Sequence, residues 1–327
     1  MAYTTIDNPE LYFQTKLYTG NGGTNALTLD GSENMQPDLV WIKNRNGTQD
    51  HHLFDSVRGT LKRLESNSNT NEETRASSLT SYDSDGFTLG TYANTNTSSD
   101  TYVAWNWKKV AGVFDIQTWT GNGSNRTISH NLGAVPQMMI VKKRSPAGGN
   151  WQVNTAQLAA NQLVELDENA AVVQDNTYFN NTRPTSSVFS LGTDGNQNTN
   201  GHTYLGYLFG NKQGVSKVGS YTGNGNADGT FVYTGFKPAF IIVKKTNASE
   251  DWELFDNKRL GYNVDNNNVV PNTNSAEATS DRLDIVSNGF KFRTAAGSVN
   301  ASGDSFIYMC FAENPFVTST GVPACAR

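Results

Sequence analysis

The segment PDLVWIKN at residues 37–44 decides the fold, because the chain writes the same pattern twice more. It returns as PQMMIVKK at residues 136–143 and as PAFIIVKK at residues 238–245. Each copy is a proline, a short apolar run and a basic end. Such a run is too short for a helix and is typical of a strand buried on both faces, and a proline is tolerated where a strand begins. Three copies at this spacing predict three copies of one domain.

Three further landmarks recur around the proline-led segments. A TGNG turn occurs at residues 19–22, 120–123 and 222–225. Asn-Gly between strand-like segments predicts a hairpin, because both residues tolerate positive φ. A short alternating strand follows later in each copy, as GFTLG at 86–90, VFSLG at 188–192 (with V in place of the first G) and GFKF at 289–292.

The last landmark is a longer apolar strand, written YVAWNW, YLGYLF and FIYMCF. Alternate positions are large and apolar in every copy, and this face is predicted to be core. Its members are Val103, Trp105, Trp107, Leu205, Tyr207, Phe209, Ile307, Met309 and Phe311. On the opposite face of the strand, the residues differ in size and polarity from copy to copy. The landmark positions on which the three-copy prediction rests are Pro37, Trp41, Pro136, Pro238, Trp105, Tyr207 and Phe311.

The composition favours an all-β protein. Hydrophobic residues make up 36% and charged residues 17%, and the 30 glycines point to many turns. The net charge of -5, without a basic stripe, argues against nucleic-acid binding. No membrane-spanning run and no signal peptide are recognised, so we expect synthesis in the cytoplasm and no membrane insertion. Cys310 and Cys325 offer neither a disulfide framework nor a metal-ligand spacing, and no cofactor is expected.

Catalytic motifs were sought and none was recognised. His51 and His52 are adjacent, so an extended backbone points them to opposite faces, while His130 and His202 are solitary. The DSDG segment at 83–86 resembles the start of a calcium loop but lacks its closing glutamate, so a turn is favoured. Paired carboxylates are interpreted as solvated surface groups. The chain is therefore predicted not to be an enzyme and to hold no metal.

Candidate ligand-binding residues come from aromatic positions beside long polar loops. Trp151 and Trp252 occupy matching places in the second and third copies, with His51 at about that place in the first. The loops that follow, at 66–81, 173–187 and 265–280, differ in sequence, as expected for a variable binding surface on a repeated scaffold. Exposed tryptophan rings stack on sugars, which makes these three residues candidates for glycan contact.

The predicted architecture is three tandem homologous antiparallel β-sandwiches, jelly-roll-like, arranged end to end as a rod. The boundaries are an N-terminal arm at 1–16, repeats at 17–110, 111–213 and 214–316, and a C-terminal tail at 317–327. A short helix is considered for residues 156–166. Each sandwich has about the size at which one core can be buried.

The first copy carries a combination of motifs that resembles a known family. They are AYTTID at 2–7, TKLYTGNG at 15–22, PDLVWIKN at 37–44, LFDSVRG at 53–59, LESN at 64–67, SDGFTLG at 84–90 and YVAWNWK at 102–108. The set resembles an uncharacterised domain family of virion proteins from marine and cyanobacterial tailed bacteriophages. The second and third copies match only at the landmarks and lack the DSVRG stretch. The resemblance implies a structural component of the particle and no catalytic residues.

The leading hypothesis is thus a non-enzymatic virion protein on the particle exterior, as a capsid decoration or a tail fibre or appendage component. It is expected to contact other virion proteins and to form a homo-oligomer, through sheet edges or the N-terminal arm. One alternative is a lectin-like adhesin for host cell-surface glycans. A third and weaker one is a polysaccharide depolymerase.

Overall fold

Each proline-led segment forms an inner strand of a large antiparallel sheet in the computed structural model, which describes residues 3–146, 148–259, 263 and 265–324. These strands are β3 (Leu39–Asn44), β12 (Met138–Ser145) and β20 (Phe236–Lys245). All six residues of β3 are buried. The prediction of strands buried on both faces is confirmed. Pro37 and Pro136 lie just before their strands, whereas Pro238 lies inside β20 at a register shift against its neighbour.

The strands fall into three sets that share one order. The first repeat contains η1 (Pro9–Leu11), β1 (Phe13–Thr19), β2 (Asn25–Thr28), β3, β4 (His52–Asp55), β5 (Lys62–Glu65), β6 (Glu73–Thr74), β7 (Leu79–Asp83), β8 (Gly86–Leu89), α1 (Ala93–Asn96) and β9 (Thr101–Trp107). The second contains β10 (Phe114–Thr120), β11 (Arg126–Ser129), β12, β13 (Gln152–Thr155), β14 (Gln162–Glu165), β15 (Val173–Gln174), η2 (Tyr178–Asn181), β16 (Val188–Leu191), α2 (Gly195–Asn198) and β17 (Thr203–Phe209). The third contains β18 (Ser216–Thr222), β19 (Phe231–Tyr233), β20, β21 (Glu253–Asp256), β22 (Asp265–Asn268), β23 (Ala278–Val286), β24 (Gly289–Phe292), α3 (Gly297–Asn300) and β25 (Ser305–Pro315).

The large sheets have equivalent topologies. Their orders are β1-β9-β3-β4-β5-β6, β10-β17-β12-β13-β14-β15 and β18-β25-β20-β21. The small sheets are β2-β8-β7, β11-β16 and β19-β24-β23-β22. In every repeat the first and last strands pair beside the proline-led strand, and the short alternating strand lies in the small sheet.

Each small sheet covers one face of its large sheet and encloses a separate apolar cluster. In the first repeat this cluster includes Val40, Ile42, Phe87 and Leu89, all from that repeat. The second and third repeats have corresponding clusters of their own residues. The architecture is therefore all-β with antiparallel sandwich packing.

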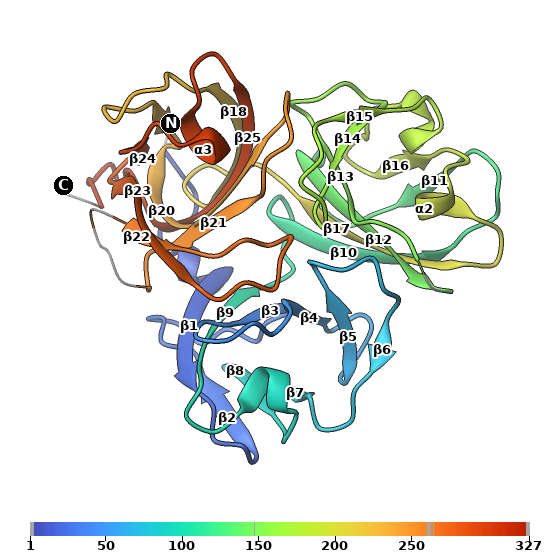
Figure 1. Ribbon diagram of the computed structural model, residues 1–327, viewed down its shortest axis with the longest axis horizontal. Coiled ribbons are helices and arrows are strands. Elements are labelled where there is room, and N and C mark those ends of the chain that lie inside the picture. Colours follow the sequence, from blue (N-terminus) through green and yellow to red (C-terminus); the bar gives the residue numbers. More distant parts are fainter. Residues whose placement is uncertain (1–2, 147, 260–262, 264, 325–327) are drawn as a thin grey trace.

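The opposite faces of the large sheets meet in the middle of the molecule. Figure 1 shows the three repeats grouped around a common centre, and one apolar cluster there takes side chains from all three. Trp105, Tyr207 and Met309 lie in it, as does Phe311. The expectation of an end-to-end rod is wrong, because the face predicted as core packs between the repeats, whereas the opposite face of the strand, with Tyr102 and Ala104, packs inside the sandwich.

Local predictions had mixed outcomes. The Ser84-Asp85 turn joins β7 to β8 with Asp83 paired to Gly86, as expected for a hairpin. The TGNG segments are not hairpins, because β1 pairs with β9 while β2 pairs with β8. They carry the chain from one sheet to the other. Their last glycines do adopt positive φ, for example 69° at Gly22.

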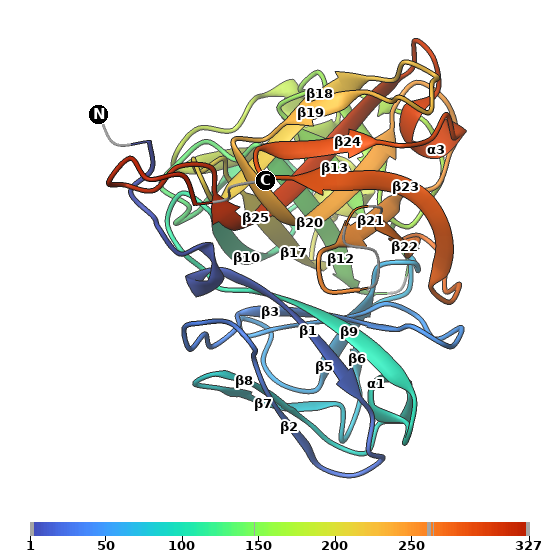
Figure 2. The same ribbon diagram turned by 90° about the vertical axis from the view of Figure 1, so that its left-hand side faces the viewer.

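Two boundary predictions also change. Residues 156–166 form turns and then β14, so the short helix considered there is wrong. Strand β1 begins at Phe13, so the last residues of the predicted arm at 1–16 belong to the first sheet. The described part of the arm contacts the third repeat: Tyr3 donates to the Gly235 carbonyl at 2.7 Å. Asp7 accepts a bond from the Ser319 backbone at 2.6 Å, which joins the two ends of the chain beside β25 (Figure 2).

A buried asparagine fixes the TGNG turn in each repeat. Asn96, Asn198 and Asn300 end the short helices α1, α2 and α3 and are fully buried. The Asn198 amide donates to the carbonyls of Ser124 at 2.7 Å and Gly192 at 2.9 Å, and its oxygen accepts from the Asn122 backbone. Buried polar groups need such partners. Over the described part of the chain, no helix has the length and apolar character required to cross a bilayer.

Candidate functional site

The three predicted ligand-binding residues occupy equivalent places where two repeats meet. We call each such contact a seam: first–second, second–third and third–first. Trp151 and His51 are 0% exposed and Trp252 is 1% exposed. A ring that stacks on a sugar must present a face to solvent. In this structure these three residues therefore do not form a glycan-binding surface.

The two buried tryptophans join the repeats. Trp151 donates from Nε1 to the Glu65 carbonyl at 2.7 Å across the first–second seam, and Trp252 donates to the Glu165 carbonyl at 2.8 Å across the second–third seam. His51 accepts from Trp41 Nε1 at 3.0 Å within the first repeat, and its Nε2 has no hydrogen-bond partner among the described residues. Across the third–first seam, Ser66 Oγ donates to the Pro271 carbonyl at 2.8 Å, so hydrogen bonds between repeats close into a ring of three.

His51 is held neutral in this place. Burial is the main reason that its pKa lies well below 6.5, and the neighbouring Lys43 adds to the effect. The Val270 carbonyl opposes it. A neutral imidazole can accept a hydrogen bond at Nδ1, and this is the bond observed from Trp41 Nε1.

A buried acid–base pair marks the first–second seam. Asp55 pairs with Arg58, both side chains having no exposure. The Tyr207 hydroxyl of the second repeat donates to Asp55 Oδ2 at 2.9 Å. Burial, and then the Asp55 charge, raise the pKa of Tyr207 well above 10, so the phenol stays protonated and donates.

The third–first seam repeats the arrangement with a different donor. Asp256 pairs with Arg259 at 2.6 Å, both buried. Trp105 of the first repeat, at the position equivalent to Tyr207, donates from Nε1 to Asp256 Oδ2 at 3.0 Å. The Arg259 guanidinium lies 5.7 Å from the Trp105 ring centre, within cation–π range.

The second–third seam is apolar at the same place. Met309 occupies the strand position of Trp105 and Tyr207, and Thr155 and Leu158 stand where the other repeats have Asp and Arg. At this seam, residues other than the Tyr or Trp donor and the Asp acceptor of the other two seams therefore occupy both positions. This agreement between residues far apart in sequence supports the register of the three seams.

A second row of contacts varies in the same way. Glu72 of the first repeat receives two bonds from Arg144 of the second, at 2.8 and 3.0 Å. Glu277 of the third receives two from Arg45 of the first, at 3.0 and 2.9 Å. At the same place in the second–third seam, the described residues bond through their backbones, from the Val172 amide to the Thr246 carbonyl at 2.9 Å.

One buried lysine completes each of the three seams. Lys43, Lys142 and Lys244 come from the basic ends of the proline-led strands and are fully buried. Lys142 donates to the carbonyls of Gly149 at 2.8 Å and, in the first repeat, Ser68 at 3.0 Å.

The other two lysines are bound in the same way across their seams. Lys43 reaches the Asn274 carbonyl of the third repeat at 3.1 Å, and Lys244 reaches the Asn169 carbonyl of the second at 2.9 Å. Burial lowers the pKa of all three lysines to about 8. Sequence analysis missed their role, although the recurring lysine at one strand position was a usable signal.

These titratable groups all bond within or across seams, where they hold the repeats together. Across the described ranges no group of three or more His, Cys, Asp or Glu is placed to hold a metal. Cys310 is buried and not in a disulfide, and Cys325 lies outside the described residues.

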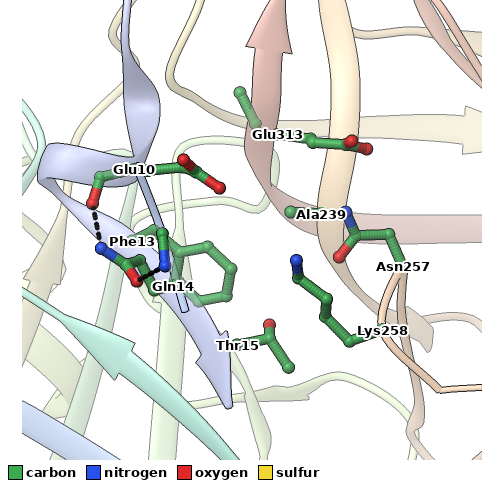
Figure 3. Close-up of a pocket in the computed structure, with 10 residues that line it drawn as sticks. Glu10, Phe13, Gln14, Thr15, Ala239, Asn257, Lys258 and Glu313 are labelled. Carbon is green, nitrogen blue, oxygen red and sulfur yellow. Dashed lines mark hydrogen bonds between the residues drawn. The ribbon is translucent and has the colours of Figure 1, made fainter. Parts of the chain in front are cut away.

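A small cavity lies between β1 and the strands β20 and β25 (Figure 3). Its volume of about 20 Å³ fits a single water molecule and no organic ligand. Thr15 Oγ1 and Asn257 Oδ1 line it without a hydrogen-bond partner. Lys258 reaches into the same space, and Gln14 is bonded to the Glu10 carbonyl at its rim.

A much larger cleft lies on the third repeat, beside the N-terminal arm. Its volume is about 420 Å³, within the range of small-molecule sites. Aromatic, amide and hydroxyl groups and one ammonium group line it, from Tyr3, Asn211, Gln213, Lys217, Tyr233 and Thr234. Sequence analysis singled out none of these residues.

The fold and these seams define an all-β protein whose antiparallel sheets pack in sandwich fashion and meet at one shared apolar cluster. Residues 8–315 match the family described as Domain of unknown function (DUF7483). Because the match spans most of the chain, the protein belongs to this family. The description gives it no activity.

Other comparisons add little. No curated protein sequence matches the chain. Among solved structures, one titled "Crystal Structure of the STIV MCP" is 9% identical, over 92% of this chain and 95% of that one, with a TM-score of 0.19. A likeness at that score carries no argument about fold or function.

Proposed function

We propose that this chain is a non-enzymatic structural protein of a bacteriophage particle, carried on the exterior as a capsid decoration or as part of a tail fibre or appendage. The resemblance of its first repeat to virion proteins of tailed phages motivates the proposal. The observation that carries it is the apolar cluster shared by all three repeats. It makes three sandwiches into one rigid body.

The buried polar groups at the seams also hold the three sandwiches together. Buried charges are costly unless they are paired. Here Asp55 and Asp256 each pair with an arginine of their own repeat and also accept a hydrogen bond from a neighbouring repeat, from Tyr207 and Trp105 respectively. A rigid body with three outward-facing small sheets and their loops suits display on a particle, since each lobe offers a surface while the centre resists deformation. We infer that the chain comprises three homologous sandwich units and presents these lobes to its surroundings.

Assembly with other virion proteins, and with further copies of the chain, is part of the proposal. The described arm residues bind the third repeat of the same chain. The outer surfaces of the lobes are therefore better placed than the arm for contacts between subunits.

Mass spectrometry of purified particles tests this function. We expect the chain at many copies per particle, and immunogold labelling should place it on the outside of the head or on the tail. Its absence from intact, infectious particles would end the proposal.

A further inference from the structure

The outer face of β19 in the third repeat exposes two aromatic rings. Phe231 is 46% exposed and Tyr233 is 48% exposed, while Val232 between them points into the sandwich core. Tyr233 also lines the large cleft. Exposed aromatic side chains on adjacent outward positions of a strand form one flat apolar surface.

The other two repeats do not carry these rings. Leu27, Ile128 and Val232 are equivalent, because each pairs with the phenylalanine of the neighbouring short strand. The outward neighbours are then Ala26 and Thr28 in the first repeat and Thr127 and Ser129 in the second. Sandwich stability therefore does not require aromatic residues at these places.

The connection after this strand is also shortest in the third repeat. Val232 precedes Pro238 by six positions, whereas Leu27 precedes Pro37 by ten. In the first repeat the longer connection lies over the start of the large sheet, where the Gly31 backbone donates to the Gln14 side chain at 2.8 Å.

The shorter connection leaves the equivalent place on the third repeat uncovered. Lys217 has the strand position of Gln14 there, and it lines the cleft. The cleft thus exists because a covering loop is shorter, and its mouth lies beside the aromatic pair.

The free edge of β19 is poorly suited to pairing with another strand. Lys217 Nζ donates to the Tyr233 carbonyl at 2.9 Å, and Tyr3 donates to the Gly235 carbonyl at 2.7 Å. These side chains occupy acceptors that an added strand would need. A concave site with exposed rings and polar side chains fits a small ligand better than a strand.

We propose that this cleft and the aromatic pair bind a saccharide made of pyranose rings. The apolar face of a sugar ring stacks on Phe231 and on the face of Tyr233 opposite the Lys217 ammonium, which lies 5.3 Å from the centre of the Tyr233 ring. The sugar hydroxyl groups bond to Gln213 and to the donor and acceptor capacity that Asn211 keeps beside its two bonds with the Val218 backbone. Among the described residues that line the cleft none is a carboxylate, and Lys217 provides a positive charge. Uronic-acid sugars and neutral ones share this recognition chemistry. The site goes beyond the virion role and does not depend on it.

The test uses the purified full-length chain on an array of neutral and uronic-acid-containing pyranose oligosaccharides, followed by titration calorimetry with each glycan that binds. The matched variant is Phe231→Thr with Tyr233→Ser, which gives the third repeat the residues that the second repeat has. We expect binding by the native chain and a loss of affinity of at least about tenfold in the variant, because two stacking contacts are removed.

The control is Thr127→Ala with Ser129→Ala on the second repeat, which should bind as the native chain does. Circular dichroism confirms that each variant is folded. No binding by the native chain at millimolar glycan, or equal binding by the Phe231/Tyr233 variant, overturns the proposal. Dissociation of a native oligomer by the Phe231/Tyr233 variant would also overturn the proposal, because the rings would then lie in a protein–protein interface.

Discussion

The hydroxyl of Tyr207 donates a 2.9 Å hydrogen bond to the carboxylate of Asp55, which lies 152 positions earlier in the chain. Both side chains are buried, and Asp55 is also paired with Arg58. The bond crosses from the second repeat to the first. A contact of this kind ties the stability of one repeat to the presence of its neighbour.

Replacing Tyr207 with phenylalanine is expected to lower the free energy of unfolding by about 1.5–3 kcal/mol. That is the usual contribution of a hydrogen bond to a charged group, and Asp55 would lose a donor in a place that water does not reach. Urea denaturation of the full-length chain measures the change.

Tyr221→Phe is the matched control for this substitution. Its buried hydroxyl donates to the uncharged Val299 carbonyl within the third repeat, at 2.6 Å, so a smaller loss of about 0.5–1.5 kcal/mol is expected. Equal losses in the two variants would show that the charge on Asp55 adds nothing at the seam.

The buried lysines predict an unusual dependence of stability on pH. Lys43, Lys142 and Lys244 have pKa values of about 8 in the folded chain, against about 10.4 when unfolded. Between these values the unfolded chain binds more protons, so stability rises with pH, by up to about 1.4 kcal/mol per pH unit for each lysine. Above pH 10 the trend reverses, because burial raises the pKa of Tyr18 and Tyr221 in the folded state.

Urea denaturation at pH 7.5, 8.5 and 9.5 measures this slope. Lys142→Met should reduce it by up to about 1.4 kcal/mol per pH unit, whereas Lys258→Met, at an exposed lysine, should leave it unchanged. A native chain whose stability is flat over this interval would contradict the assignment of the three lysines.

Strand positions and the direction of each face could be predicted from the sequence, because alternation and the recurring proline-led run fix them. What the shared apolar face packs against could not be predicted from the sequence. Trp105 and Ala104 both lie in a strand buried on two sides, and alternation does not say which side faces another repeat. The pattern is equally compatible with repeats arranged end to end and with repeats packed around a shared core, and the end-to-end prediction is wrong.

Candidate site residues failed for a related reason. Trp151 and Trp252 adjoin polar loops in the sequence, but those loops are packed against the next repeat and the rings are covered. Phe231 and Tyr233 were missed because their strand has only three residues. Aligning Phe-Val-Tyr with Ala-Leu-Thr and Thr-Ile-Ser was the signal that would have found them.

The asparagine that ends α2 provides a third prediction. Asn198→Asp keeps the acceptor for the Asn122 backbone but replaces a donor by an anion facing the carbonyls of Ser124 and Gly192. We expect a loss of at least about 3 kcal/mol, since a buried charge is left unpaired against two carbonyls. Asn196→Asp in the same short helix is the control and should change thermal stability little. A shift of the melting temperature equal to that of the control would contradict the role given to Asn198.

The shared core makes the three repeats one cooperative unit. Each large sheet buries one face against side chains of the other two repeats, and burying a single large apolar side chain contributes about 1.5–3 kcal/mol. Calorimetry of the full chain should therefore show a single transition whose calorimetric and van't Hoff enthalpies agree. A fragment of residues 111–213 should fail to remain a folded monomer, because the removal of its neighbours exposes Ile116, Tyr207 and Phe209. Sedimentation and circular dichroism of that fragment provide the comparison. A stable monomeric fragment, or three separate transitions in the full chain, would mean that the central cluster couples the repeats only weakly.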